Sequence, residues 1–306
     1  MGHLPVMLAE VLKALEPRDG AHYIDGTFGG GGYARAILEA CDCRVLGIDR
    51  DPEAIRRGEK LVALYPGRLT LVHGEFSQMD RFLADSGEEG TNGVVCDLGV
   101  SSFQFDEPVR GFSFRADGPL DMRMSLSGLS AADVVNTADE KTLADIIARY
   151  GEERQARRIA RAIVAARPLT RTVELAELVA RVLGPAAARL AVHPATRTFQ
   201  ALRIHVNDEL GELSHALEAA TRALKPQGRL AMVSFHSLED RIVKRFLTEH
   251  SASAPRASRH TPQARRASVP LYRLFGARPQ VPGAAEIADN PRARSAKLRT
   301  AERLAA

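Results

Sequence analysis

The stretch that decides the fold is YIDGTFGGGG, residues 23–32, in which a short apolar run reaches Asp25 and four consecutive glycines follow. Glycine loses more conformational entropy on folding than any other residue, so a run of four indicates a backbone that approaches something closely. The flanking patterns predict a strand over 22–25 and a helix over 33–40. A glycine-rich loop between a strand and a helix is typical of a cofactor site at the carboxyl end of a parallel strand.

Strands and helices continue to alternate on the C-terminal side of this loop. The hydrophobic pattern predicts strands over 44–49, 69–74 and 93–99, with helices over 52–64 and 77–84 between them. Such alternation predicts an α/β fold with a doubly wound, parallel sheet.

The alternation stops near residue 100. Residues 101–128 are rich in Gly, Pro and Asp and are predicted to form a loop. Helical patterns follow at 130–136, 139–150, 152–166, 172–183 and, as one long helix, 195–224. A strand over 229–235 and a helix over 237–250 come next, and residues 251–290 are predicted to be loop. We therefore expect a core formed by residues 1–104 and 192–306, with an inserted helical domain at 105–191 that recognises the substrate.

Charge is distributed unevenly along the chain. Residues 251–306 contain 11 Lys and Arg against 3 Asp and Glu, a net charge of +8, whereas the first 250 residues have a net charge of −4. A basic tail on a slightly acidic body favours a polyanionic partner such as nucleic acid. A solvated tail with no partner, or a structural strand near 295–302, stays open. The residues expected to contact phosphates of such a partner, here called the tail arginines, are Arg256, Arg259, Arg265 and Arg266.

Several classes of protein are disfavoured by composition. No apolar run approaches the ~20 residues that cross a bilayer, and the amphipathic N-terminus does not resemble a secretory signal. We therefore expect a cytoplasmic protein with no membrane partner. The three cysteines, Cys41, Cys43 and Cys96, form no CxxC pair, so we expect reduced thiols and no metal site.

The sign of Asp25 favours one cofactor class over another. A carboxylate at the end of the first strand would repel a diphosphate, but it would attract an ammonium by ~4 kcal/mol at 4 Å and an effective dielectric constant of 20, before desolvation. This favours S-adenosylmethionine over NAD, although the frame from Gly29 to Ala34 fits the G-x-G-x-x-A dinucleotide pattern. Asp25 as a cap of the following turn also stays open.

The next three strands also end in acidic residues. Asp49 ends the second strand, where a carboxylate can accept both ribose hydroxyls of an adenosine. Glu75 and Phe76 follow the third strand, where Phe76 could lie against adenine, and Asp97 ends the fourth. Because carboxyl ends of parallel strands share one edge, a binding site explains these carboxylates better than separate structural roles.

The chain as a whole resembles the RsmH (MraW) family of bacterial methyltransferases. The resemblance runs from about residue 3 to 303 and is carried by PVMLAEVL, YIDGTFGGGGY, GIDRDPEAI, DLGVSS, RGFSF, DGPLDMRM, YGEER, HPATRTFQALRIHVN, SFHSLEDRIVKRF and NPRARSAKLRTAER. It implies a class I, Rossmann-like S-adenosylmethionine-dependent methyltransferase with a helical insertion. It also implies methylation of the N4 amine of a decoding-region cytosine in 16S rRNA within the small ribosomal subunit.

The resemblance also assigns cofactor contacts. They fall on Gly31, Gly32, Tyr33, Asp49, Phe76, Asp97 and Gln104. Two positions depart from the family pattern, which usually has histidine at Tyr33 and proline at Phe103. Tyrosine is tolerable if position 33 uses only its backbone N–H, whereas a required histidine side chain would change cofactor affinity.

Asp97 is the candidate catalytic residue. The lone pair of a cytosine N4 amine is delocalised into the ring, so an acceptor at its N–H groups can orient the amine and localise the lone pair. Amine-modifying class I methyltransferases often carry an Asn/Asp-Pro-Pro-aromatic string at this place, whereas this chain has DLGV at 97–100. Asp97 could therefore serve the cofactor, the cytosine or both.

Candidate substrate contacts lie in the loop RGFSFRADGPLDMRM and after the fifth strand. They are Arg110, Phe114, Asp117, Asp121, Arg123 and His236. Aromatic residues interleaved with charges suit an extruded base and its phosphates. An Ω-loop that packs its own phenylalanines, and a helix-start role for Ser237 and Glu239 next to His236, also stay open.

Two other function classes stay open on the sequence. The glycine-rich loop permits an NAD-dependent oxidoreductase, and a methyltransferase fold can be kept by a non-catalytic RNA-binding or ribosome-assembly protein. Retention of Asp25, Asp49 and Asp97 weighs against the second of these. A homodimer is left open as well.

Overall fold

The computed structural model describes residues 5–185, 192–251 and 269–305. The chain forms two compact units. One joins Met1–Gly99 to Leu210–Ala306, and the other is Val100–Glu209. The second unit therefore extends beyond the 105–191 expected for the insert, at both ends.

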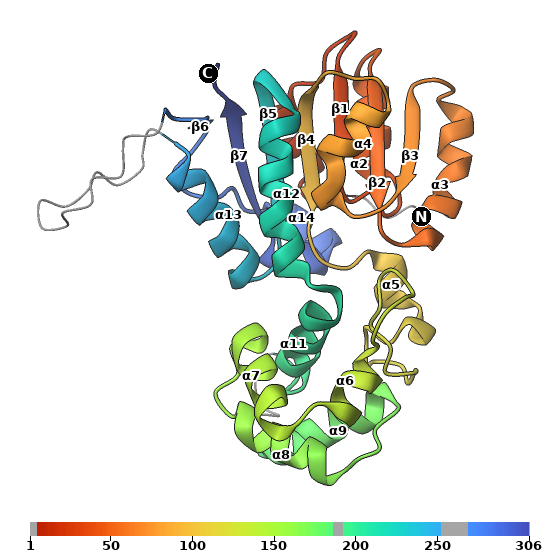
Figure 1. The fold of residues 1–306 in the computed structure, drawn as a ribbon, viewed down its shortest axis with the longest axis vertical. Coiled ribbons are helices and arrows are strands. Elements are labelled where there is room, and N and C mark those ends of the chain that lie inside the picture. Colours follow the sequence, from red (N-terminus) through yellow and green to blue (C-terminus); the bar gives the residue numbers. More distant parts are fainter. Residues whose placement is uncertain (1–4, 186–191, 252–268, 306) are drawn as a thin grey trace, which may run out of the picture. The chain divides into compact units, whose positions relative to one another are not determined.

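The first unit is built on a seven-stranded sheet with the order β3-β2-β1-β4-β5-β7-β6 (Figure 1). The strands are β1 (His22–Asp25), β2 (Arg44–Asp49), β3 (Leu69–His73), β4 (Thr91–Asp97), β5 (Leu224–Ser234), β6 (Tyr272–Leu274) and β7 (Lys297–Arg303). Strands β1 to β5 pair in parallel. Strand β7 runs antiparallel to β5, and β6 runs antiparallel to β7. The predicted parallel sheet is thus confirmed for its five predicted strands, and β7 and β6 extend it with an antiparallel edge.

Register brings the carboxyl ends of the parallel strands to one edge. Asp25 of β1 lies opposite Gly47 of β2 and Val95 of β4. Asp97 of β4 lies opposite Val233 of β5. The loops after these strands therefore open on the same side of the sheet.

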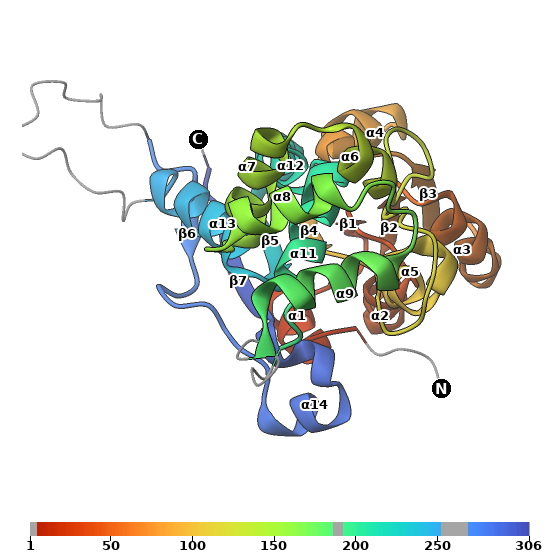
Figure 2. The ribbon, with the colours of Figure 1, turned by 90° about the horizontal axis from the view of Figure 1, so that it is seen from below.

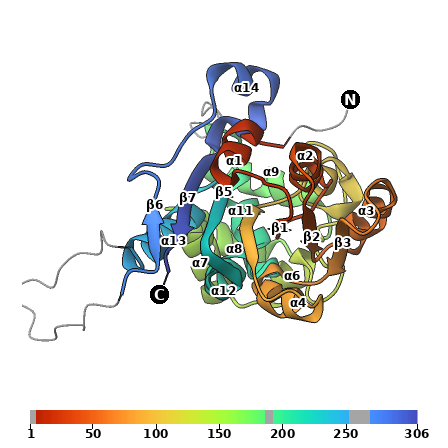
Figure 3. The same ribbon diagram turned by 90° about the horizontal axis from the view of Figure 1, so that it is seen from above.

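Helices cover both faces of this sheet, as the view along the strands shows (Figure 3). They are α1 (Leu8–Leu15), α2 (Gly32–Ala40), α3 (Pro52–Leu64), α4 (Met79–Asp85), α12 (Glu209–Ala223), α13 (Ser237–Glu249) and α14 (Ala284–Asp289), with short 3-10 helices at Phe76–Gln78 and Pro291–Ser295. Buried side chains of α1 and α2 pack with one face of the strands, and those of α4, α12 and α13 pack with the other. The doubly wound α/β architecture expected from the sequence is confirmed.

The second unit is helical. Its helices are α5 (Ser102–Asp106), the 3-10 helix Pro108–Arg110, α6 (Ala131–Thr137), α7 (Glu140–Gly151), α8 (Ala156–Ala165), α9 (Thr172–Leu183) and α11 (Thr196–Asn207). Helices α6 to α9 and α11 share one apolar core. Figure 2 shows these helices from below. Leu143, Ile147, Ile163 and Leu202 are fully buried in it.

The structure corrects two predicted elements. The long helix expected over 195–224 is broken at Asp208, which has a left-handed φ of 45° and separates α11 from α12. Aspartate tolerates this conformation better than most residues. The loop expected over 251–290 contains β6 and α14, and Tyr272 of β6 is fully buried.

Membrane-spanning helices are absent from the part of the chain that the structure describes: none of its helices combines the required length and apolar character.

Candidate active site

Four acidic residues gather at the carboxyl edge of the sheet in the first unit. Asp25, Asp49 and Asp97 are the last residues of β1, β2 and β4, and Glu75 follows β3. Because β1 pairs with both β2 and β4, Asp25 stands between the other two aspartates along this edge. The strand-end carboxylates predicted from the sequence are therefore brought together.

Asp25 is fully buried, and its carboxylate accepts hydrogen bonds from the backbone on both sides of the glycine-rich loop. Its Oδ1 accepts the N–H of Thr27 at 3.3 Å, and its Oδ2 accepts the N–H of Ala34, in the first turn of α2, at 3.1 Å. Burial raises the pKa of this carboxyl from 3.8 to about 7, with a further contribution from the charge of Asp49. The capping role left open by the sequence is confirmed.

The glycine loop is shaped by close contacts. The N–H of Gly29 donates to Oδ2 of Asp49 at 2.7 Å, which ties the loop to the end of β2. Gly31 has a φ of 74°, a conformation that residues with a side chain rarely adopt, and it caps α2. A Cβ on Gly32 would lie 2.3 Å from Cγ of Pro5. These two glycines are required by backbone geometry and by packing with the N-terminal segment.

Asp49 has one oxygen bound to the loop and the other to its own turn. Its Oδ1 accepts the N–H of Asp51 at 2.8 Å, and burial raises its pKa. Beyond β3, Glu75 is ion-paired with Arg50 at 3.0 Å. The partly buried Phe76 packs against the core beside it. Glu75 is thus neutralised by a neighbour.

Asp97 has the least satisfied carboxylate of the group. Its backbone N–H donates to Oγ1 of Thr27 at 2.6 Å, whereas its Oδ1 is buried and has no hydrogen-bond partner among the described residues. Burial raises its pKa well above the usual value, and the charges of Asp25 and Glu239 raise it further. A buried acceptor without a partner is costly, so this oxygen is suited to a donor from a ligand.

The positive charge at this edge lies beside β2 and β3, where Arg50 pairs with Glu75. Within the described ranges, neither Asp25 nor Asp97 forms an ion pair, and the pKa values of Asp25, Asp49 and Asp97 are all raised. A cationic ligand would stabilise the ionised carboxylates and so lower these pKa values. These carboxylates therefore fit a ligand that carries an ammonium or sulfonium group, and they disfavour a diphosphate.

Tyr33 uses its side chain for packing. It is buried, and its hydroxyl donates to the backbone carbonyl of Val6 in the N-terminal segment. Burial raises the pKa of its hydroxyl, with further contributions from Asp97 and Asp25. Because the side chain is engaged, the backbone N–H is the group that position 33 can offer to a ligand.

Gln104 belongs to the helical unit, where it completes a capping box at the start of α5. Its backbone N–H donates to Oγ of Ser101 at 3.3 Å, and its Oε1 accepts the N–H of Ser101 at 3.0 Å. The family-implied cofactor contact at Gln104 stays a prediction. Phe103, the other departure from the family pattern, is exposed within α5.

The candidate substrate residues of the long loop make contacts within the helical unit. Arg110 is buried and donates to the carbonyls of Arg123 and Met124, both at 3.0 Å. Phe114 packs against His193 and Phe199, with ring centroids 4.7 Å apart in each case.

The acidic residues of the same loop are ion-paired. Asp117 binds Arg171 at 2.7 Å, and Asp121 binds Arg123 at 2.7 Å. These contacts support the alternative of a self-packed loop, and substrate contact by these residues stays a prediction.

His236 is the N-cap of α13. Its Nδ1 accepts the N–H of Glu239 at 3.4 Å, and Oε2 of Glu239 accepts the N–H groups of Phe235 and His236 at 2.8 and 3.2 Å. The predicted capping role of Glu239 is confirmed, but the partner is His236 where Ser237 was expected. Glu239 is almost fully buried and raises the pKa of Asp97, which the capping pattern alone did not indicate. The tail arginines lie outside the described residues.

Comparisons with known proteins give consistent results. The MraW methylase family matches residues 1–304. Ribosomal RNA small subunit methyltransferase H from Xanthobacter autotrophicus is 60% identical over 304 residues, covering 98% of this chain and 87% of that protein. The protein of the same name from Rhodospirillum centenum is 56% identical over 307 residues, covering 99% and 93%.

Similar solved structures are more distant. An rRNA methylase from Streptococcus thermophilus has a TM-score of 0.44 and 11% identity, covering 100% of this chain and 99% of that one. A Streptococcus mutans protein solved in complex with SAH has a TM-score of 0.45 and 12% identity, covering 99% and 100%.

Proposed function

Because the chain belongs to the MraW methylase family, whose match spans residues 1–304, we propose that it methylates the N4 amine of a decoding-region cytosine in 16S rRNA. It is an S-adenosylmethionine-dependent methyltransferase with a class I fold, and it acts on ribosomal RNA of the small subunit. The exact base and atom are the proposed part.

The observation that carries the proposal is the buried carboxylate oxygen of Asp97, which has no hydrogen-bond partner among the described residues. This oxygen, Oδ1, lies at the carboxyl end of β4, next to a fully buried Asp25. The carboxylates at this edge would repel the diphosphate of a dinucleotide cofactor. A methyltransferase that binds a sulfonium cofactor and a neutral amine uses both the charge and the free acceptor.

The cofactor would be held by the first unit. Asp25 supplies the negative charge, and Asp49 keeps accepting capacity for the ribose hydroxyls. The backbone of Gly31, Gly32 and Tyr33 lies at the start of α2. The N–H of Gly31 donates to the carbonyl of Phe28 at 2.6 Å, so the N–H groups of Gly32 and Tyr33 are the ones proposed for a carboxylate, with Gly31 as a backbone contact. When bound, S-adenosylmethionine supplies an electrophilic methyl group on sulfur. Phe76 is the proposed contact for adenine.

Asp97 is the group proposed to act on the amine. An N4 hydrogen donated to Oδ1 would orient the amine and draw its lone pair out of conjugation. Transfer leaves a protonated amine. The cationic cofactor would favour the ionised form of Asp97, which then accepts the extra proton, and burial favours the resulting neutral carboxyl. The alternative, in which Asp97 serves only the cofactor, predicts a different kinetic outcome.

The helical unit is proposed to recognise the RNA. A cytosine stacked inside a helix would not present its amine to a sheet edge, so the base must be unstacked or already single-stranded. Arg110, Phe114, Asp117, Asp121 and Arg123 of its long loop are the proposed contacts, with Gln104 as a proposed cofactor contact. His236 of the first unit is a further candidate. Because the substrate is a ribosomal subunit, we propose a cytoplasmic enzyme; the comparisons give the homodimer no support.

The experiment is the kinetics of Asp97→Asn on small ribosomal subunits that lack the modification. Asparagine keeps the shape and one acceptor oxygen but removes the charge and the proton-accepting ability. We expect kcat to fall by ~10²-fold or more, as is usual for a positioned base, while the Kd for S-adenosylmethionine changes little. A loss confined to cofactor affinity would assign Asp97 to the cofactor alone.

A further inference from the structure

A cavity lies where the edge strand leaves the sheet of the first unit. Leu274 of β6 pairs with Ala301 of β7, and Gln280 pairs with Leu298. Between these two points the edge segment has five residues, 275–279, opposite only two residues of β7. The extra residues bow outward and leave a cavity of about 120 Å³ that is also bounded by α13.

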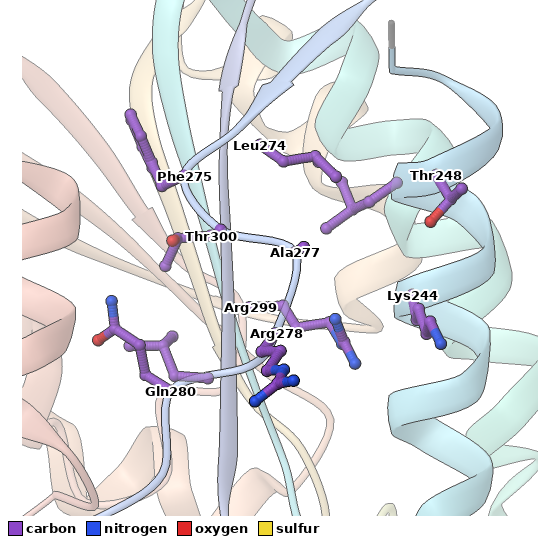
Figure 4. Close-up of a pocket in the computed structure, with 12 residues that line it drawn as sticks. Lys244, Thr248, Leu274, Phe275, Ala277, Arg278, Gln280, Arg299 and Thr300 are labelled. Carbon is purple, nitrogen blue, oxygen red and sulfur yellow. The ribbon is translucent and has the colours of Figure 1, made fainter. Parts of the chain in front are cut away.

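The lining of this cavity is basic. Figure 4 shows Lys244 from α13, Arg299 from β7 and Arg278 from the segment after β6 around one space. No Asp or Glu is among the described residues that line it. Among its lining residues, Arg299 binds the carboxylate of Asp240 at 2.7 Å, and Asp240 also binds Lys297 at 3.4 Å, so this carboxylate is shared between two cations.

Lys244 and Arg278 are the cations available to a ligand. Both are exposed, and neither has an ion pair within the described part of the chain. Arg299 is only 10% exposed at its side chain and is fixed by Asp240. The cavity thus combines one fixed and two free cations, which is suited to an anion with several oxygens. Its volume is several times the ~10–15 Å³ that one water requires on the same measure, so a tetrahedral phosphate group fits.

The cavity lies close to the candidate active site in the same sheet. Asp97 is opposite Val233 of β5, and Val233 is opposite Leu298 of β7. Adjacent strands are about 4.8 Å apart, so the backbone of Leu298 lies about 10 Å from that of Asp97. Both sites therefore lie in the first unit. An RNA strand whose target base reaches Asp97 has backbone phosphates within about 10 Å of that base.

We propose that this cavity binds a backbone phosphate of the ribosomal RNA, one or a few nucleotides away from the methylated base. The inference rests on the proposed function for its substrate. Lys244 and Arg278 bind the phosphate oxygens, and Arg299, which is held by Asp240, contributes positive charge from β7. The site sets the position of the strand and leaves base selection to other contacts, as phosphate contacts usually do.

The test compares two charge-matched double variants of the full chain. Lys244→Ala with Arg278→Ala removes the free cations of the cavity. Lys60→Ala with Arg245→Ala removes one lysine and one arginine from exposed positions that do not line it. Binding to small ribosomal subunits is measured by co-sedimentation across a salt series, alongside methyl-transfer kinetics and calorimetry with S-adenosylmethionine.

We expect the cavity variant to raise the KM for subunits about tenfold, with kcat and cofactor affinity within twofold of wild type. Its log–log salt slope for binding should be shallower by ~0.7, the loss of one phosphate contact on single-stranded RNA. The control variant should match wild type within twofold, and Lys244→Arg with Arg278→Lys should restore most of the affinity.

Three outcomes would overturn the proposal. The first is an equal effect of the two double variants on subunit binding, and the second is an unchanged salt slope. The third comes from a thermal-shift assay with pyrophosphate as the probe: a cavity variant that is no longer stabilised by pyrophosphate yet binds subunits normally. The last result would identify a site for small free anions. Because subunit binding is measured separately, absence of methyl transfer by the wild type would count against the proposed function and not against the cavity.

Discussion

Asp25→Asn is expected to make the protein more stable at pH 8 while weakening its cofactor site. The carboxyl is fully buried, and its pKa is raised from 3.8 to about 7. A carboxyl with a raised folded-state pKa contributes stability that is fully present below its unfolded pKa and is lost as pH rises through its folded pKa. The window for Asp25 therefore runs from about pH 4 to about pH 7, and Asp49 and Asp97 are shifted in the same direction.

The magnitude follows from the shift. At 1.36 kcal/mol per pKa unit, ionised Asp25 costs about 4 kcal/mol at pH 8. Asparagine removes this cost, but its amide has one acceptor oxygen for the two N–H groups of Thr27 and Ala34, which costs about 1–3 kcal/mol. The variant should therefore gain about 1–3 kcal/mol at pH 8. The gain should be about 2–3 kcal/mol smaller at pH 5, where wild-type Asp25 is protonated.

The assay is urea unfolding of both proteins at pH 8 and pH 5, followed by circular dichroism. Asp240→Asn is the control with the opposite sign. Although burial raises the pKa of Asp240, Arg299 and Lys297 hold it below the usual value, so this variant should be destabilised most at pH 8. An Asp25→Asn protein that is less stable than wild type at pH 8, or a difference that does not depend on pH, would refute the reasoning.

Two further variants test the cofactor site. Asp49→Ala removes the carboxylate proposed for the ribose hydroxyls, so calorimetry should show S-adenosylmethionine binding weakened by about 1.5–3 kcal/mol; unchanged affinity would remove Asp49 from the site. Tyr33→Phe removes the hydroxyl that donates to Val6, so it should lower the free energy of unfolding by about 1 kcal/mol and leave cofactor affinity unchanged, because only the backbone of residue 33 is proposed to bind. A large loss of cofactor affinity in Tyr33→Phe would show that the side chain matters.

The parallel part of the fold could be predicted because local signals agree there. Strands β1 to β4 are apolar runs that end in polar residues, and the helices between them carry regular apolar spacing. Asp51 directly precedes α3, and its carboxylate accepts the N–H of Glu53 at 3.0 Å. In these segments hydrophobic periodicity and capping chemistry indicate the same structure.

The missed elements depend on tertiary contacts. Strand β6 has only three residues, and it is stabilised by pairing with β7 and by burial of Tyr272. The break at Asp208 interrupts a pattern that is helical on both sides, so periodicity gave no sign of it. Short edge strands and single left-handed residues leave little trace in a sequence.

The site was predictable to the extent that it depends on strand ends. Asp25, Asp49 and Asp97 were placed correctly because register alone brings the ends of parallel strands together. The contact between Thr27 and the backbone of Asp97, and the effect of Glu239 on its pKa, join segments that are distant in sequence. The side-chain role of Tyr33 likewise depends on where Val6 lies.

The central claim is tested most directly by nucleoside mass spectrometry of 16S rRNA. Small subunits that lack the modification are incubated with the protein and S-adenosylmethionine, and the methylated position is mapped at base resolution. We predict one methyl group on the N4 amine of a decoding-region cytosine, with much weaker activity on short free duplexes. A methyl group on cytosine C5, on a ribose 2′-oxygen, or on transfer RNA only would contradict the account.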